Sequence, residues 1–310
     1  MHLIYQVHQL KTKLFIFLSS FFFCTSITAQ QYYFDDYGVK EGLSQSSVYN
    51  ISQDKNAVLW LGTGAGLSSF DGKEFVNFSV DEGLAEGSVK ATISDSLGNI
   101  WAGHAGGGVS LIQNKKAKIL FNFKADITSF AFAKDGSLWL GTYKEGAIQI
   151  LNPYDYHSDS LQIRQYKGQD GLSDIVFQVV ALKNGTICFV TDVGVKQYIP
   201  SKKEFSNLVI KDMPAYFQIT CMLEQRNGDL WLGTYNGGLY HHSASGEFKI
   251  YDFMRDGIAS NWISALTEDN KGNVWIGTWG GGISLIDTHK KVITINSDNG
   301  LPDAYIRCFT

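Results

Sequence analysis

Aromatic, amide and carboxylate side chains gather in this sequence just after a repeated Gly-Thr phrase and just before strand-like segments. Aromatic rings stack on the C–H faces of sugars, and amides and carboxylates hydrogen-bond sugar hydroxyls. The combination predicts a binding site for an oligosaccharide or another small molecule. Its candidate residues are Tyr143, Asp192, Tyr235, Asn236, Asn261, Trp262 and Trp279. Any single aromatic side chain more often serves packing between loops, so the prediction rests on the group.

The elements that must position these residues come from a repeated phrase, Leu-Trp-Leu-Gly-Thr, whose copies recur at intervals of 38–49 residues. A degenerate copy, Ile187–Thr191, carries Cys188 at the tryptophan position. Repeats of this length, built of strand-like segments, are typical of β-propeller blades. The tryptophans are expected to wedge between neighbouring blades, and the glycines to permit close backbone approach. These structural tryptophans are Trp60, Trp101, Trp139, Trp231 and Trp275.

The last full repeat predicts how one blade is built. Between its first two strands, Asp269–Asn273 is rich in residues that accept positive φ, which indicates a hairpin turn. A calcium site is disfavoured there because the spacing lacks a full set of oxygen ligands. Four antiparallel strands with short connections make one blade. Apolar and alternating segments place these strands at Ile263–Thr267, Val274–Thr278, Ile283–Ile286 and Val292–Ile295.

A second phrase, Asp/Glu-Gly-Leu, separates the blades, as at Glu41-Gly42-Leu43. The count of first strands predicts an all-β propeller with six complete four-stranded blades and the start of a seventh at Ile306. Tyr32–Phe34 is expected to form the outer strand of that seventh blade. Because an open ring exposes strand edges, the chain is interpreted as a truncated seven-bladed propeller.

The net charge argues against one class of partner, and the N-terminal sequence indicates where the protein is located. A net charge of −4 without a basic stripe argues against nucleic acid. Residues 1–29 have the basic, apolar and small-residue order of a secretory signal peptide, with cleavage after Ala29. Residues 30–310 then form an exported propeller, periplasmic or on the periplasmic side of the inner membrane. The remaining cysteines are odd in number and lie in apolar segments predicted as strands, which indicates buried free thiols at Cys188, Cys221 and Cys308.

These repeats resemble the regulator propeller repeats of bacterial hybrid two-component sensors. The matching elements, which recur in later copies, are Glu41–Ser44, Val48, Asp54, Leu59–Thr63 and Gly66–Leu67. The resemblance implies an extracytoplasmic sensor of a carbohydrate or another nutrient, and a possible homodimer. In that family a β-sandwich, a membrane helix and a histidine kinase follow and continue the phosphorelay. These domains do not occur in the 310 residues, so phosphotransfer is not assigned to them.

Two other functions stay open. The glycine-rich repeats also resemble propeller lyases such as virginiamycin B lyase, which would make the chain a stand-alone periplasmic lyase or hydrolase. Those enzymes use a histidine and an acidic residue with a metal, and the comparable residue here is His104, without an evident partner. His241 and His242 are neighbours in a predicted strand and face opposite sides, so no metal is expected there. The sequence shows no catalytic or cofactor motif, and a protein-interaction propeller would use the same loops.

Overall fold

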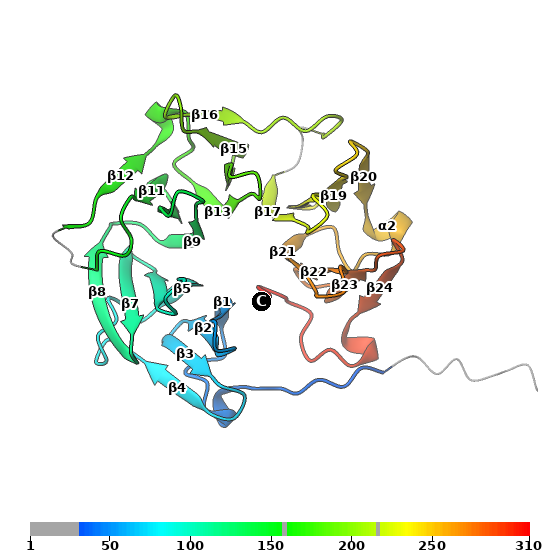
Figure 1. Ribbon diagram of the computed structural model, residues 1–310. Coiled ribbons are helices and arrows are strands. Elements are labelled where there is room, and N and C mark those ends of the chain that lie inside the picture. Colours follow the sequence, from blue (N-terminus) through cyan, green and yellow to red (C-terminus); the bar gives the residue numbers. More distant parts are fainter. Residues whose placement is uncertain (1–30, 157–159, 215–217) are drawn as a thin grey trace, which may run out of the picture.

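Six four-stranded antiparallel sheets surround a common centre in a computed structural model that describes residues 31–156, 160–214 and 218–310 (Figure 1). In each sheet the first strand is innermost, and the strands follow outward in chain order. The prediction of an all-β propeller with six complete blades is confirmed. The predicted signal peptide, residues 1–29, lies outside the described residues.

The first three blades follow one another from the N-terminal side. Blade 1 contains β1 (Val48–Gln53), β2 (Leu59–Thr63), β3 (Gly66–Phe70) and β4 (Phe75–Phe78). Blade 2 contains β5 (Val89–Ser94), β6 (Ile100–His104), β7 (Gly108–Gln113) and β8 (Lys116–Asn122). Blade 3 contains β9 (Ile127–Phe132), β10 (Leu138–Thr142), β11 (Ala147–Ile150) and β12 (Ile163–Tyr166).

The other three blades repeat the pattern. Blade 4 contains β13 (Val176–Ala181), β14 (Ile187–Thr191), β15 (Gly194–Ile199) and β16 (Glu204–Asn207). Blade 5 contains β17 (Ile219–Glu224), β18 (Leu230–Thr234), β19 (Leu239–His242) and β20 (Phe248–Tyr251). Blade 6 contains β21 (Ile263–Glu268), β22 (Val274–Thr278), β23 (Ile283–Ile286) and β24 (Val292–Ile295).

Short helical turns carry the chain from one blade to the next. They are η1 (Val39–Glu41), η3 (Gly168–Asp170), α2 (Phe253–Asp256) and η4 (Ser297–Asn299). Each ends at the glycine of the Asp/Glu-Gly-Leu phrase or of its variants Asp-Gly-Ile and Asn-Gly-Leu. Gly171, with φ 87°, adopts the left-handed conformation that ends helices. No helix in the three described ranges is long and apolar enough to cross a membrane.

The repeated tryptophans fill the core between blades. Trp101, Trp139 and Trp231 are at most 1% exposed. The glycine two residues later lets the next blade approach, since a Cβ built on Gly103 would lie 2.5 Å from Cγ2 of Ile127 in β9. Cys188 is completely buried at the tryptophan position of β14. The predicted wedge is therefore confirmed for these three tryptophans and the close approach for Gly103, whereas Trp275 in blade 6 is only partly buried.

The cysteines follow the expectation with one exception. Cys188, Cys221 and Cys308 are all free thiols, and Cys188 and Cys221 are buried within strands. Cys308 was expected in a strand as well, but it lies after η4 in irregular backbone and is partly exposed. No strand of the described residues pairs with the backbone around Cys308, which stays irregular.

The Asp269 carboxylate organises the β21–β22 hairpin turn. It accepts hydrogen bonds from the backbone N–H groups of Lys271 and Asn273, from Asn273 Nδ2, and from the Trp275 indole at 3.0 Å. Burial raises the pKa of Asp269, but these hydrogen bonds outweigh it and lower the pKa to about 2. The predicted hairpin turn is confirmed, and the Asp269 carboxylate contacts the turn and Trp275 in the strand that follows it.

In Asp269→Asn, the free energy of unfolding is expected to fall less between neutral and acid pH than it does in the wild type. Because the folded pKa is depressed, the carboxylate stabilises the fold above its unfolded pKa of about 3.9, and this stabilisation is lost as the pH falls towards about 2. Urea unfolding of wild type and variant at about pH 7 and pH 2.5 measures the difference. The exposed Asp36→Asn change is the control. Equal acid sensitivity of wild type and Asp269→Asn would contradict the assignment.

Candidate ligand-binding face

One end of the propeller carries the loops that connect the blades and the loops between the second and third strands. The strands of each blade alternate in direction, so the blade-to-blade crossing and the second-to-third-strand loop both lie at the end where the first strand begins. We call this end the loop face. The hairpin turns after the first and third strands, such as the Asp269 turn, lie at the opposite end. All seven predicted site residues lie in loops of the loop face.

A chain of touching aromatic rings crosses the loop face. The ring centroids of Tyr235 and Trp262 are 4.5 Å apart, those of Trp262 and Trp279 are 5.5 Å apart, and those of Trp279 and Tyr305 are 5.3 Å apart. We call these four residues the aromatic ladder. Tyr235 and Tyr305 are about half exposed, and the two tryptophans are half-buried. The ladder therefore offers accessible ring surface on an anchored base.

Backbone contacts between successive loops hold the ladder in place. The Trp279 N–H donates to the Trp262 carbonyl at 3.0 Å, and the Gly280 N–H donates to the Ala304 carbonyl at 3.1 Å. Trp279 and Tyr305 also face each other across an isolated β-bridge. The rings come from loops of blades 5 and 6 and from the segment after η4. Their spacing is therefore set by the packing of blades and not by any one loop.

Cationic groups stand at one end of the ladder. The Arg307 guanidinium lies 5.1 Å from the Trp279 ring and 5.5 Å from the ring of Tyr49 in β1. The Lys90 ammonium lies 3.5 Å from the centroid of the same Tyr49 ring. These are cation–π contacts. The face thus combines stacking surface with positive charge, which suits a polar ligand that carries hydroxyls or acidic groups.

The structure brings together only part of the predicted site. Tyr235, Trp262 and Trp279 form the ladder, and Asn236 follows Tyr235 with φ 67° in the same turn. Asn261 is adjacent to Trp262, but its side-chain oxygen accepts from the Phe253 N–H at the start of α2. This gives Asn261 a helix-start role that its position in the sequence did not reveal.

Two predicted residues stand apart from the ladder. Tyr143 in blade 3 is 44% exposed, and its ring neighbour is the Lys144 ammonium at 5.5 Å. Asp192 in blade 4 accepts a hydrogen bond from the Ser173 hydroxyl. Among the ring contacts of the described residues, none joins Tyr143 to the ladder. Both lie on the loop face but do not form one site with the tryptophans.

The sequence reasoning missed Tyr305. A signal was present, because Tyr305 directly precedes Ile306 just as Trp262 directly precedes Ile263, the first residue of β21. Aligning the residues that precede each first strand would have placed Tyr305 beside Trp262 in the repeat. The two residues differ in type, which hid the correspondence.

The Nε2 atoms of His104 and His241 have partners within the fold. His104 is completely buried, its Nε2 lies 2.9 Å from the Ser110 hydroxyl, and burial lowers its pKa to about 4. His241 stacks on Trp231 with ring centroids 4.0 Å apart, and its Nε2 lies 2.7 Å from Asp229. A buried neutral His104 offers no acid or base to a ligand on the surface. Within residues 31–156, 160–214 and 218–310, no three His, Cys, Asp or Glu side chains are grouped to hold a metal ion.

Comparisons with known proteins agree with the repeat pattern. The two-component regulator propeller family matches residues 213–236 and 257–280. A segment of 56 residues is 46% identical to histidine kinase P4 of Formosa agariphila, covering 17% of this chain and 4% of the kinase. The chain therefore spans a small fraction of that relative's length.

Two solved structures show the same fold. The extracellular domain of BT4673, a B. thetaiotaomicron protein named as a one-component system, superposes with a TM-score of 0.71 at 21% identity, covering 90% of this chain and 37% of that one. Virginiamycin B lyase from Staphylococcus aureus superposes with a TM-score of 0.63 at 15% identity, covering 82% of this chain and 86% of the lyase. At these identities the likeness concerns the fold alone.

Proposed function

We propose that this chain, two of whose repeats match the two-component regulator propeller family, is the ligand-sensing propeller of an exported signal-transduction protein. The likeness to an extracellular domain of a bacterial signalling protein supports the proposal, as does the short match to a histidine kinase. In this proposal the propeller lies on the periplasmic side of the inner membrane and acts with signalling domains beyond these residues. Homodimerisation is part of the same proposal and rests on the family resemblance.

The ligand class we propose is an oligosaccharide bound along the aromatic ladder. The observation that carries this proposal is the unbroken contact of Tyr235, Trp262, Trp279 and Tyr305 on the loop face. Successive rings can stack against successive sugar units, while Asn236 and the Arg307 guanidinium supply polar contacts at the sides. Binding would change the contacts of these loops with other domains and so pass on a signal.

The mass of the native gene product tests the sensor assignment. An antibody against residues 31–310 identifies the product in membrane and soluble fractions, and intact-mass analysis gives its size. A membrane-associated species much heavier than this chain is the expected result. A soluble species no heavier than this chain would leave the propeller without signalling domains and would overturn the proposal.

We further propose a seventh blade whose first strand begins at Ile306. The Ile306 carbonyl accepts from the Ser264 hydroxyl, just as the Ile263 carbonyl accepts from Thr220 Oγ1 at 2.7 Å. A Cβ on Gly277 would lie 2.6 Å from Ile306 Cγ2, the same distance that separates such a Cβ on Gly233 from Ile263. Ile306 thus stands where Ile263 stands one blade earlier.

The N-terminal side supports the outer strand of the same blade. The Tyr32 N–H donates to the Asn299 carbonyl at 2.8 Å, and a Cβ on Gly300 would lie 2.2 Å from the Tyr32 carbonyl oxygen. The corresponding Gly83 before blade 2 approaches the carbonyl of Ala117 in the outer strand β8. Tyr32 therefore lies where an outer strand would lie. In Figure 1 the C-terminal segment runs towards the centre of the ring and the first described residues pass at its outside, both between blades 6 and 1.

The packing of blade 1 fits this arrangement. Leu61 in β2 is only partly buried and lines a cavity of about 770 Å³ beside Ile306, whereas Leu140 and Leu232 at the same repeat position are completely buried. A structure of the native gene product tests the idea. Two strands between Ile306 and Tyr32 are expected, and a ring closed by blade 6 directly on blade 1 would refute it.

The lyase alternative has one observation in its favour, the shared fold with virginiamycin B lyase. It needs an accessible histidine on the loop face, and the buried His104 does not provide one. A protein partner on the same loops is the other alternative. Binding of a protein fragment, but not of any oligosaccharide, to the ladder would favour it.

A further inference from the structure

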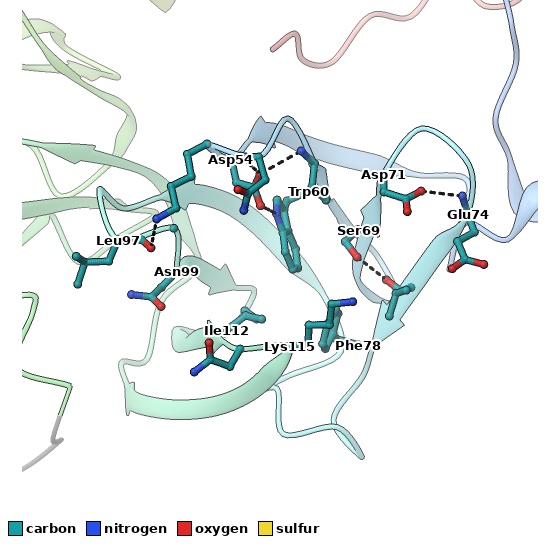
Figure 2. Close-up of a pocket in the computed structure, with 16 residues that line it drawn as sticks. Asp54, Trp60, Ser69, Asp71, Glu74, Phe78, Leu97, Asn99, Ile112 and Lys115 are labelled. Atoms are coloured by element: carbon teal, nitrogen blue, oxygen red, sulfur yellow. Dashed lines mark hydrogen bonds between the residues drawn. The ribbon is translucent and has the colours of Figure 1, made fainter.

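A groove between blades 1 and 2 opens at the end of the propeller opposite the loop face. It has a volume of about 350 Å³, and its floor includes Val58, Trp60 and Phe78. Figure 2 shows Trp60 beside Asp54 in blade 1, and Lys115 of blade 2 among the other side chains that line the groove. The Trp60 indole N–H donates to Asp54 Oδ2 at 3.0 Å. The oligosaccharide proposal makes no use of this groove.

The equivalent groove between blades 2 and 3 is filled by a tyrosine of the chain itself. The Tyr156 ring packs 6.5 Å from the Trp101 ring. Its hydroxyl donates to Asp95 Oδ2 at 3.0 Å and accepts from Asn99 Nδ2 at 2.7 Å. Its backbone carbonyl accepts from the Lys118 ammonium at 3.1 Å. One groove of this shape therefore already holds a tyrosine presented on a loop.

Hairpin length explains why one groove is filled and the other is open. In blade 3 the sequence between β11 and β12 runs from residue 151 to residue 162, and Tyr156, in its described first part, reaches the groove. In blade 2, β7 and β8 are joined by the tight turn Asn114–Lys115, both with positive φ, since Gln113 pairs with Lys116. A two-residue turn cannot reach back over Trp60.

The main positions of the two grooves correspond, although the Trp60 indole donates to Asp54 whereas the Trp101 indole N–H has no hydrogen-bond partner among the described residues. Asp54 and Asp95 each open the first hairpin of their blade, and Trp60 and Trp101 follow at the same spacing. The strand registers place Val76 where Lys118 stands. Val58 stands where Asn99 stands in the other groove. A phenol over Trp60 could therefore donate to Asp54, as Tyr156 donates to Asp95, but would have no counterpart of the Asn99 amide that donates to Tyr156.

We propose that the groove over Trp60 binds a tyrosine side chain presented by a peptide segment of a partner protein. The ring would pack on Trp60 and Phe78, and the phenol would donate to Asp54 Oδ2 as Tyr156 donates to Asp95. The partner's segment would lie across the exposed β4 edge, near Val76, which is 43% exposed. This places a protein contact on the end of the propeller away from the aromatic ladder.

Indole ¹⁵N NMR with capped probes tests the proposal, with the Trp60 signal assigned by its loss in Trp60→Phe. N-acetyl-tyrosinamide and the capped peptide Pro-Tyr-Asp-Tyr, the sequence of residues 153–156, are expected to shift the Trp60 signal saturably. The peptide should bind more tightly than the single residue. N-acetyl-phenylalaninamide, which has no hydroxyl for Asp54, should bind several-fold more weakly. Equal binding of the two capped residues would overturn the phenol contact.

Two variants keep the test decisive. Val58→Asn restores the missing donor and should tighten tyrosinamide binding by about two- to tenfold, the range expected for one added hydrogen bond. Tyr156→Ala opens the neighbouring groove, where the same probe should shift the Trp101 signal. A shift at Trp101 in this variant, with Trp60 unmoved at the same concentrations, would show that the open groove is not a tyrosine site.

Discussion

Replacement of Trp139 by alanine is expected to lower the free energy of unfolding by about 3–5 kcal/mol, the range for truncating a large buried aromatic side chain. Trp139 is 1% exposed. Its ring centroid lies 5.3 Å from Tyr166 in its own blade and 5.3 Å and 4.9 Å from Phe189 and Tyr198 in blade 4. The variant leaves a cavity lined by rings of two blades, which cannot close without moving a whole sheet.

Trp262→Ala is the matched control for this prediction. Trp262 is also a tryptophan in contact with other rings, but it is half-buried on the loop face. We expect its loss of stability to be well below that of Trp139→Ala, because water can reach the space it leaves. Urea unfolding of both variants measures the difference. Equal losses would contradict the assignment of the repeated tryptophan as the wedge between blades.

Trp279→Ala is expected to weaken oligosaccharide binding at least tenfold, or about 1.4 kcal/mol. Trp279 is one of the two inner rings of the ladder: it contacts Trp262 on one side and Tyr305 on the other, and the Arg307 guanidinium lies 5.1 Å from its centroid. Its removal divides the stacking surface in two and releases the guanidinium from its ring partner. Isothermal titration calorimetry against an oligosaccharide that binds the wild type measures the change.

Two further variants separate a ladder site from a diffuse one. Tyr235→Ala shortens the ladder at its end, so a smaller loss is expected than for Trp279→Ala. Tyr143→Ala removes another exposed aromatic side chain of the loop face that lies outside the ladder, and should leave the affinity unchanged. A loss for Tyr143→Ala as large as that for Trp279→Ala would mean that the ladder is not the binding surface.

The blades could be predicted because each repeat carries its own local signals. Strand β21 was predicted as Ile263–Thr267 and spans Ile263–Glu268, since alternation and the Asp269 turn fix both ends within the repeat. Cys188 was placed at a tryptophan position from spacing alone. Such inferences need only the signals within one repeat and the spacing between repeats, and not how the blades pack.

The site could be predicted only in part, because its contacts join different repeats. The contact of Trp262 with Trp279 and of Trp279 with Tyr305 depends on how loops of adjacent blades meet. The Asn261 side chain could bind a ligand or accept a hydrogen bond from the backbone at the start of α2, and residue type alone does not decide between the two. The insertion of Tyr156 beside Trp101 likewise depends on how far a long hairpin folds back, and hairpin length alone does not give that path.

The central claim, that a carbohydrate binds along the aromatic ladder, is tested most directly by the indole ¹⁵N signals of the seven tryptophans during titration of the wild-type propeller with oligosaccharides. The account predicts that the signals of Trp262 and Trp279 shift together and saturate. The signals of Trp60, Trp101, Trp139, Trp231 and Trp275 should stay in place, because those rings lie within the blades and away from the ladder. Saturable binding that leaves Trp262 and Trp279 unmoved, or binding by no oligosaccharide at all, would contradict it.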